Sequence, residues 1–268
     1  MEIVNEIRQI FNSILEHHEA IDKLEFSAQT KNGDKIKYQF DRAKYERRMQ
    51  RQKQAKRKDL FNAIFDILGL TFSISLLVLL IVYSAMNAEA PQVITYALYG
   101  TLLIVFFTMS MFYYFSNAMS RTKEFFYNLT GIARFFLIAG TYTPFFFLAF
   151  TGFTGWIYLG ILWALVALGV FFQSLDTEIS HSVANAMALI MVWLFSLTIP
   201  QLAETVSLAG VAWLIIGAVF FTLWLASYWI VEWKKGKGKV FTFDPTNLFV
   251  LFGSFFYFWT MLNKVMYL

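Results

Sequence analysis

Two ionisable side chains stand within long apolar stretches of the sequence. Asp66 lies near the start of the first stretch, and Arg134 lies in the first half of the third. A charge inside an apolar medium is costly, so such residues usually pair with each other or line a polar cavity. We therefore predict that Asp66 and Arg134 form a pair. The alternative is that Asp66 lies at the membrane interface and Arg134 extends to water.

The residue types present limit the chemistry that the chain could perform. It has no cysteine, which excludes disulfides, thiolate nucleophiles and thiolate metal ligands. Its three histidines are His17, His18 and His181. Adjacent residues of a helix point in different directions, so His17 and His18 are predicted to be solvated rather than metal-bound. His181 is expected at the start of a helix, and Ser110 has no neighbouring His or Lys to act as its base.

The composition indicates that the elements holding these residues lie in a bilayer. Apolar residues make up 58% of the chain and charged residues 15%, against about 45–50% and about 25% in soluble domains. Seven apolar stretches are each long enough to cross a hydrocarbon core of about 30 Å. They are Phe61–Met86, Ile94–Ala118, Phe125–Phe150, Trp156–Phe172, His181–Ile199, Leu208–Val231 and Pro245–Leu268. The expected fold is an all-α membrane protein, a seven-transmembrane helical bundle in region 60–268.

A polar extension precedes the first stretch. Apolar residues recur at helical spacing from Ile3 to Ile21, which predicts an amphipathic helix. Alternating apolar and polar residues on both sides of Asn32-Gly33 predict a β-hairpin, so residues 1–41 are expected to form a small cytoplasmic helix and hairpin. Region 42–59 carries nine basic residues and is predicted to be a juxtamembrane helix that binds anionic lipid headgroups. Membrane lipids are the expected partners, nucleic acid is not, and the oligomeric state is open.

The distribution of Lys and Arg among the connections predicts the orientation of the bundle. The connections 87–93, 151–155 and 200–207 contain neither residue. Arg121 and Lys123 follow the second stretch, and four lysines lie within 234–239 after the sixth. Because positive residues accumulate on the cytoplasmic side, we expect a cytoplasmic N-terminus and an extracytoplasmic C-terminus.

Several segments carry a resemblance to a known family. Leu137–Phe145, with the sequence LIAGTYTPF, closely resembles the third-span signature of the hemolysin III family, the bacterial branch of the progestin and adipoQ receptor group. Tyr96–Gly100 and Ser110–Tyr114 are similar to its second span, Leu248–Ser254 to its seventh and Leu60–Gly69 to its first. The resemblance implies seven spans in a bacterial plasma membrane, with the N-terminus in the cytoplasm.

The resemblance also implies a zinc site near the cytoplasmic side of the bundle. One His from span two and a His-x-x-x-His pair from span seven would bind the metal, assisted by an Asp from span three and a Ser from span two. Three imidazoles leave a position for a water that zinc activates for attack on an amide. On this sequence the serine is Ser110, but the other positions hold different residues: Tyr114 for the span-two His, Thr130 for the Asp, Phe243 and Asn247 for the span-seven pair, Tyr257 for a further His and Asp66 for a first-span His.

We predict a polar cluster in place of the metal, in which the charge of Arg134 replaces that of zinc. Its members would be Asp66, Ser110, Tyr114, Thr130, Arg134 and Asn247. Zinc is expected for the family but its ligands are missing, so no cofactor, no metal ligand and no catalytic residue is assigned.

The predicted function is that of a metal-free membrane protein of the hemolysin III type, in membrane homeostasis or, as the family name implies, in cytolysis. The first alternative is a zinc-dependent lipid-amide hydrolase of the ceramidase-like kind, which the missing ligands oppose. A receptor of the progestin and adipoQ receptor kind is the second. A transporter or channel, with Asp66 and Arg134 on its pathway, would need discontinuous helices that the sequence does not indicate.

Overall fold

The computed structural model describes residues 23–29, 35–116, 121–150, 152–175, 178–236 and 246–266. The amphipathic helix predicted before residue 23 and the turn predicted at Asn32-Gly33 lie outside the described residues. The chain divides into two compact units, Met1–Lys56 and Arg57–Leu268.

The first unit contains two strands, β1 (Lys23–Gln29) and β2 (Lys35–Asp41), in the segment where alternation predicted a hairpin. They pair in antiparallel fashion, with Lys23 opposite Asp41 and Gln29 opposite Lys35. Helix α2 begins directly after β2, at Arg42.

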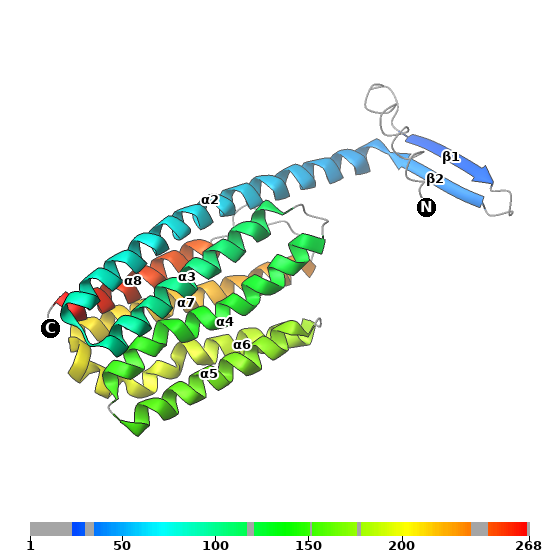
Figure 1. The fold of residues 1–268 in the computed structure, drawn as a ribbon. Coiled ribbons are helices and arrows are strands. Elements are labelled where there is room, and N and C mark those ends of the chain that lie inside the picture. Colours follow the sequence, from blue (N-terminus) through cyan, green and yellow to red (C-terminus); the bar gives the residue numbers. More distant parts are fainter. Residues whose placement is uncertain are drawn as a thin grey trace. The chain divides into compact units, whose positions relative to one another are not determined.

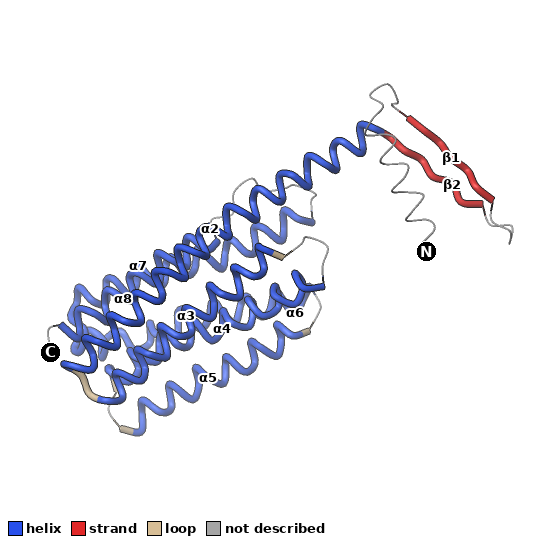
Figure 2. The backbone as a smooth tube through the Cα atoms, turned by 45° about the horizontal axis from the view of Figure 1, so that its top comes forward, coloured by secondary structure: helices blue, strands red, loops and turns tan. Residues whose placement is uncertain are grey.

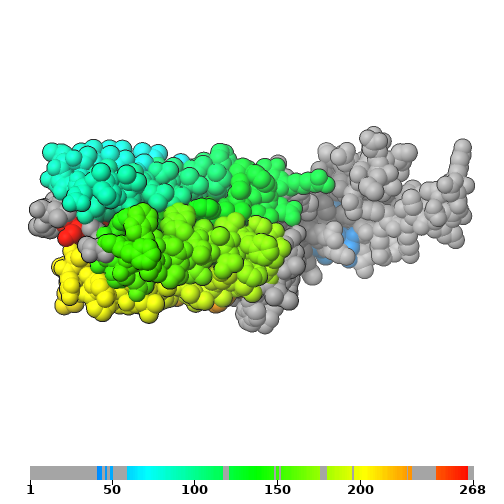
Figure 3. All heavy atoms as spheres, turned by 60° about the horizontal axis from the view of Figure 1, so that its bottom comes forward, coloured from blue at the N-terminus to red at the C-terminus, as the bar shows by residue number. Residues whose placement is uncertain are grey.

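The second unit is a helical bundle. The described residues form seven α-helices and one short 3-10 helix: α2 (Arg42–Asn87), α3 (Ala90–Phe115), α4 (Arg121–Ala149), α5 (Phe153–Ser174), α6 (Glu178–Trp193), η1 (Leu194–Thr198), α7 (Ile199–Gly236) and α8 (Thr246–Met266). The helices of this unit run alongside one another (Figures 1 and 2). On the face shown in Figure 3, side chains of neighbouring helices meet along the length of the bundle.

Membrane-spanning helices are evident from length and hydropathy. Among the residues that the structure describes, four segments are long and apolar enough to cross a bilayer: Asp59–Asn87, Ala90–Phe115, Phe153–Ser174 and Ser180–Ser227. The last of these covers most of α6, all of η1 and much of α7. The chain is therefore a largely helical integral membrane protein, with α4 and α8 packed into the same bundle.

Helix α4 lies at the centre of the bundle, because it contacts α3, α5, α6 and α7. Most of its residues between Thr130 and Phe146 are buried. A helix enclosed by protein needs no lipid-facing apolar surface, so α4 can carry threonines and an arginine. The hydroxyls of Thr141 and Thr143 donate hydrogen bonds of 2.7 Å to the carbonyl oxygens of Leu137 and Ala139 respectively, one turn earlier. The LIAGTYTPF segment is thus part of the packed core.

Buried tyrosines connect α4 and α3 to neighbouring helices. The hydroxyl of Tyr142 donates to the carbonyl oxygen of Val192 at 2.8 Å and lies 2.6 Å from the hydroxyl of Tyr257. Because the Tyr142 proton is directed at Val192, Tyr257 is the donor of the second bond. These bonds join α4 to α6 and α8, and the hydroxyl of Tyr99 likewise joins α3 to the backbone of Ser254 in α8 at 2.9 Å.

The segment predicted as a connection, Pro200–Ser207, is helical for most of its length. Helix α7 begins at Ile199 and continues to a kink at Ser207, whose φ is 70° and ψ is 160°. Pro200 is compatible with this helix, because in the first turn its missing N–H has no helical partner to lose. The Oγ of Ser207 accepts a hydrogen bond from the backbone N–H of Gly210 at 3.3 Å and so caps the helix that follows.

One close approach between helices gives a direct test of the packing. A Cβ atom added at Gly169 of α5 would lie 2.3 Å from the ring of Phe135, which is fully buried in α4. We expect Gly169→Ala to lower the free energy of unfolding by about 1–3 kcal/mol, because the ring cannot move without strain.

The matched control is Gly160→Ala in the same helix. A Cβ at Gly160 would meet no atom within 4 Å, so the better helix propensity of alanine should make this variant neutral or more stable by up to about 1 kcal/mol. Equilibrium unfolding in detergent measures both changes. Equal effects of the two substitutions would contradict the packing of α5 on α4.

Candidate functional site

Three helices meet in a closed set of hydrogen bonds formed by Asp66, Ser110 and Asn247, here called the Asp66 cluster. Asp66 lies in α2, Ser110 in α3 and Asn247 in α8, and their exposed fractions are 0%, 2% and 4%. The Ser110 hydroxyl donates to Oδ2 of Asp66 at 2.9 Å. The Nδ2 of Asn247 donates to Oδ1 of Asp66 at 2.6 Å and to Oγ of Ser110 at 3.0 Å. Both carboxylate oxygens therefore have a donor.

The local sequence explains why these side chains meet. Asn247 is the second residue of α8, and the hydroxyl of Thr246 before it bonds the hydroxyl of Ser227 in α7 at 2.9 Å. This contact anchors the start of α8 beside α7.

Asn62 lies one turn before Asp66 in α2, is 1% exposed and has an Nδ2 atom without a hydrogen-bond partner among the described residues. Polar groups of α2 thus face the bundle interior over two turns.

A second set of buried polar side chains surrounds Arg134 of α4; Arg134, Gln173, His181 and Asn185 are here called the Arg134 cluster. The guanidinium donates to Oδ1 of Asn185 in α6 at 2.6 Å and to Oε1 of Gln173 in α5 at 3.0 Å. Gln173 also contacts Nδ1 of His181 through its Nε2 at 3.3 Å. Arg134, Gln173 and Asn185 are 3%, 3% and 4% exposed.

The predicted pair of Asp66 with Arg134 is wrong. The bonds of the Asp66 carboxylate go to α3 and α8, whereas the guanidinium bonds side chains of α5 and α6. No ion pair joins Asp66 and Arg134, both of which are described. The physical reason is that each charged group already has hydrogen-bond partners on its own neighbouring helices. Asn247 and Ser110 donate to Asp66, whereas Asn185 and Gln173 accept from Arg134. The alternative position of Asp66, at an exposed interface, is also wrong because the side chain is fully buried.

Thr130 and Tyr114, the other predicted members, make different contacts. Thr130 donates its hydroxyl proton to the carbonyl oxygen of Phe126 in its own helix at 2.8 Å. The ring of Tyr114 packs edge-on against Tyr113, with the ring centroids 4.8 Å apart. Phe243 lies outside the described residues. Of the six predicted members, the structure joins Asp66, Ser110 and Asn247 directly and places Arg134 in a different cluster.

Sequence reasoning missed Gln173 and Asn185, which are the partners of Arg134. Both are amide residues near the ends of apolar stretches. Gln173 lies near the end of α5 and Asn185 in the first half of α6, and a short connection joins these two helices. A buried arginine on one helix predicts acceptors on its neighbours, so these two amides were the available signal.

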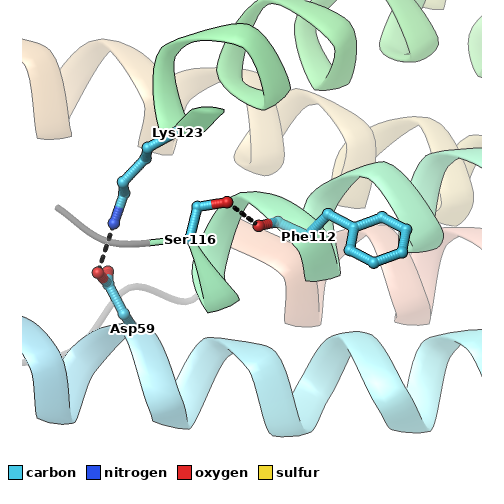
Figure 4. A network of polar contacts seen from close by, with 4 residues as sticks. All are labelled: Asp59, Phe112, Ser116 and Lys123. Carbon is cyan, nitrogen blue, oxygen red and sulfur yellow. Dashed lines mark hydrogen bonds and ion pairs between the residues drawn. The ribbon is translucent and has the colours of Figure 1, made fainter. Parts of the chain in front are cut away.

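An ion pair in the first turn of α4 joins this helix to α2. The Nζ of Lys123 bonds Oδ2 of Asp59 and lies 4.9 Å from the centre of the Tyr113 ring (Figure 4). Nearby, at the end of α3, the hydroxyl of Ser116 donates to the carbonyl oxygen of Phe112 at 2.6 Å. The side chains of Lys123 and Asp59 are 15% and 22% exposed, so this pair contributes about 1 kcal/mol at most.

The Asp66 cluster does not fit the zinc that the family resemblance implies. Zinc sites in proteins use Cys, His and carboxylate ligands, with imidazoles predominating in catalytic sites. Here the side chains are one carboxylate, one hydroxyl and one carboxamide, and the carboxamide turns its N–H₂ group, which is a donor and not a metal ligand, towards Asp66. In the part of the chain that the structure describes, no group of three His, Cys, Asp or Glu residues could hold a metal.

Comparison with known proteins assigns the chain to a family. The family model described as Haemolysin-III related matches residues 54–258. The chain belongs to the hemolysin III family. Hemolysin-3 of Bacillus cereus is 28% identical over 219 residues, covering 82% of this chain and 97% of that protein. The Hemolysin-3 homolog of Bacillus subtilis (strain 168) is 28% identical over 179 residues, covering 67% of this chain and 82% of that protein. No solved structure gives a significant match.

Membership of the hemolysin III family confirms the resemblance found in the sequence. The matched region begins within α2 and ends within α8, so it contains both the Asp66 cluster and the Arg134 cluster. The strands β1 and β2 precede it. The polar sites thus belong to the hemolysin III region of the chain.

Proposed function

We propose that the chain is a metal-free, non-enzymatic member of the hemolysin III family that acts in membrane homeostasis. The observation that carries this proposal is the Asp66 cluster. Where the family resemblance implies a metal and an activated water, the carboxylate of Asp66 is occupied by N–H and O–H donors of Asn247 and Ser110. A carboxylate bound in this way holds three helices together, which is a structural role.

The proposal includes seven membrane spans, formed by α2, α3, α4, α5, α6 with η1, α7 and α8. Four apolar segments support it, together with the packing of α4 and α8 among them. The lysines and arginines at 42–58, 121–123 and 234–239 favour a cytoplasmic N-terminus and an extracytoplasmic C-terminus. The two Bacillus relatives favour a bacterial plasma membrane.

The lipid-amide hydrolase is the less favoured function. Its chemistry needs imidazole ligands or a base beside a nucleophile. The positions implied for two of the imidazoles hold Tyr114 and Asn247, and the Ser110 hydroxyl donates to a carboxylate that Asn247 also binds. Neither arrangement supplies a metal-bound water or an activated serine.

Metal analysis of the purified chain tests the proposal. We expect far less than one zinc per chain after growth in zinc-supplemented medium and purification without chelators. A matched variant with Tyr114→His, Phe243→His and Asn247→His restores the implied ligands and should bind about one zinc per chain, as a three-histidine site does. Stoichiometric zinc in the unsubstituted chain would overturn the metal-free assignment.

Cytolysis is the second candidate, and the names of the two Bacillus relatives, Hemolysin-3 and Hemolysin-3 homolog, favour it. Release of haemoglobin from erythrocytes separates the two functions. Membrane homeostasis predicts no release above that of the detergent alone. Cytolysis predicts release that rises with the concentration of the protein.

A further inference from the structure

A small pocket lies beside the Arg134 cluster and is not used by the proposed function. Its lining residues are Tyr127, Gly131, Arg134, Gln173, His181 and Asn185. The cavity measures about 10 Å³, which is room for roughly one water-sized group. Every lining residue except the glycine has a polar side chain, and no lining residue is an Asp or a Glu.

The hydrogen bonds of the cluster determine what the lining side chains can offer to a ligand. Arg134 uses the side-chain oxygens of Asn185 and Gln173 as acceptors. The amide of each therefore presents N–H donors on its other side. The Nε2 of Gln173 is directed at Nδ1 of His181, and when that nitrogen accepts, the proton of the ring is on Nε2. The pocket is thus lined by a guanidinium, two side-chain amides and an imidazole, and it has no acidic side chain.

The packing around the pocket holds these donors in position. A Cβ atom at Gly131 would lie 2.5 Å from Nε2 of Gln173, so the glycine provides the space in which that amide lies against α4. The guanidinium of Arg134 lies 5.4 Å from the centre of the Phe135 ring. The ring of Tyr127 packs edge-on against His181, with centroids 6.1 Å apart. A pre-arranged set of donors favours binding because little side-chain freedom is lost.

The pocket lies at the end of the bundle where α5 leads into α6. Gln173 is the penultimate residue of α5, and His181 is the fourth residue of α6. Helix ends of a membrane bundle lie near the headgroup region, which both solutes and lipid phosphates can reach. Arginine is the side chain that most often recognises phosphate, because its planar N–H groups match the phosphate oxygens.

We propose that this pocket binds the anionic oxygen of a phosphate group. One oxygen would occupy the cavity beside Arg134, and the rest of the group would lie at its mouth. The phosphate has two sources with the same chemistry, free inorganic phosphate and the headgroup of an anionic phospholipid.

The test uses the full chain in nanodiscs and has two arms. In the first arm the nanodiscs contain phosphatidylcholine only, and inorganic phosphate is titrated at constant ionic strength. In the second arm no phosphate is added, and the fraction of phosphatidylglycerol is increased. The midpoint of thermal unfolding is measured in both, since a ligand that binds the native state raises it. A rise in the first arm identifies free phosphate, and a rise in the second identifies the lipid headgroup.

The decisive variant is Asn185→Asp. It keeps an oxygen for Arg134 to bond but replaces the Nδ2 donor of the pocket by a negatively charged oxygen. We expect the protein to stay folded and the affinity for phosphate to fall at least about tenfold. Asn87→Asp makes the same charge change at an exposed position at the end of α2 and should leave the affinity unchanged.

The proposal fails if the unfolding midpoint of the unsubstituted chain rises in neither arm. It also fails if Asn185→Asp retains the full rise. If Asn185→Asp does not fold, His181→Phe takes its place, because the half-buried ring keeps its packing against Tyr127 while losing its N–H donor. A full rise in that variant would equally overturn the proposal.

Discussion

Replacing Asn247 by leucine is expected to lower the free energy of unfolding by about 2–3 kcal/mol. The substitution removes both hydrogen bonds that Nδ2 donates, to Asp66 at 2.6 Å and to Ser110 at 3.0 Å. One oxygen of a fully buried carboxylate then has no donor, and leaving such a group unsatisfied costs about 1–3 kcal/mol or more. Leucine fills a similar volume, so the loss comes from the polar contacts. Equilibrium unfolding in detergent or bicelles measures it.

Two further variants make this prediction specific. Asn263→Leu changes the same residue type at a half-buried position of α8 and should change stability by less than about 0.5 kcal/mol. In the double variant Asp66→Leu with Asn247→Leu, both polar partners are gone, so the cost should be smaller than the sum of the single costs. Strict additivity of the two substitutions would show that Asp66 and Asn247 do not interact.

Arg134→Leu is expected to lower the free energy of unfolding by about 2–4 kcal/mol. The guanidinium serves as donor to Oδ1 of Asn185 and to Oε1 of Gln173, and both amide side chains are buried. Each oxygen left without a donor costs about 1–3 kcal/mol. Rotation of the two amides towards the pocket lowers this cost. The unfolding equilibrium again supplies the measurement. Arg121→Leu, at the exposed first residue of α4, is the matched control and should cost less than about 0.5 kcal/mol.

Asp66→Asn combined with Arg134→Leu shows which partner the arginine has. Because the two charged groups bond different helices, adding Asp66→Asn should give no relief, and the two costs should add within about 0.5 kcal/mol. Recovery of stability in the double variant would restore the charge pair that the sequence suggested and would contradict the observed clusters.

The sequence predicted the helical architecture well because long apolar stretches have few alternatives in a bilayer. The predicted stretch Phe125–Phe150 corresponds to α4, and Trp156–Phe172 corresponds to α5. The segment predicted as the connection Pro200–Ser207 is helical up to the kink at Ser207. Polar residues between two apolar stretches can form either an extended loop or a short helix. Hydropathy cannot separate these two cases.

The candidate site was predicted only in part, because periodicity shows that a helix exists but not how it is rotated against its neighbours. Ser110 and Asn247 could be placed beside Asp66 through the family resemblance, which relates residues of different helices. No such relation was known for Gln173 and Asn185. The charge of Arg134 therefore suggested the acid in α2 as its partner, whereas the structure pairs it with two uncharged amides.

The two clusters share no residue and no helix. One joins α2, α3 and α8, and the other joins α4, α5 and α6. The bundle thus contains two triplets of helices, each closed by its own polar contacts. In the described part of the chain, the triplets are connected by the packing of α3 on α4, the ion pair between Asp59 and Lys123 and the hydrogen bond between Tyr142 of α4 and Tyr257 of α8. All three connections end on α4, so through them a conformational change at the phosphate pocket would reach the Asp66 cluster only by a movement of α4.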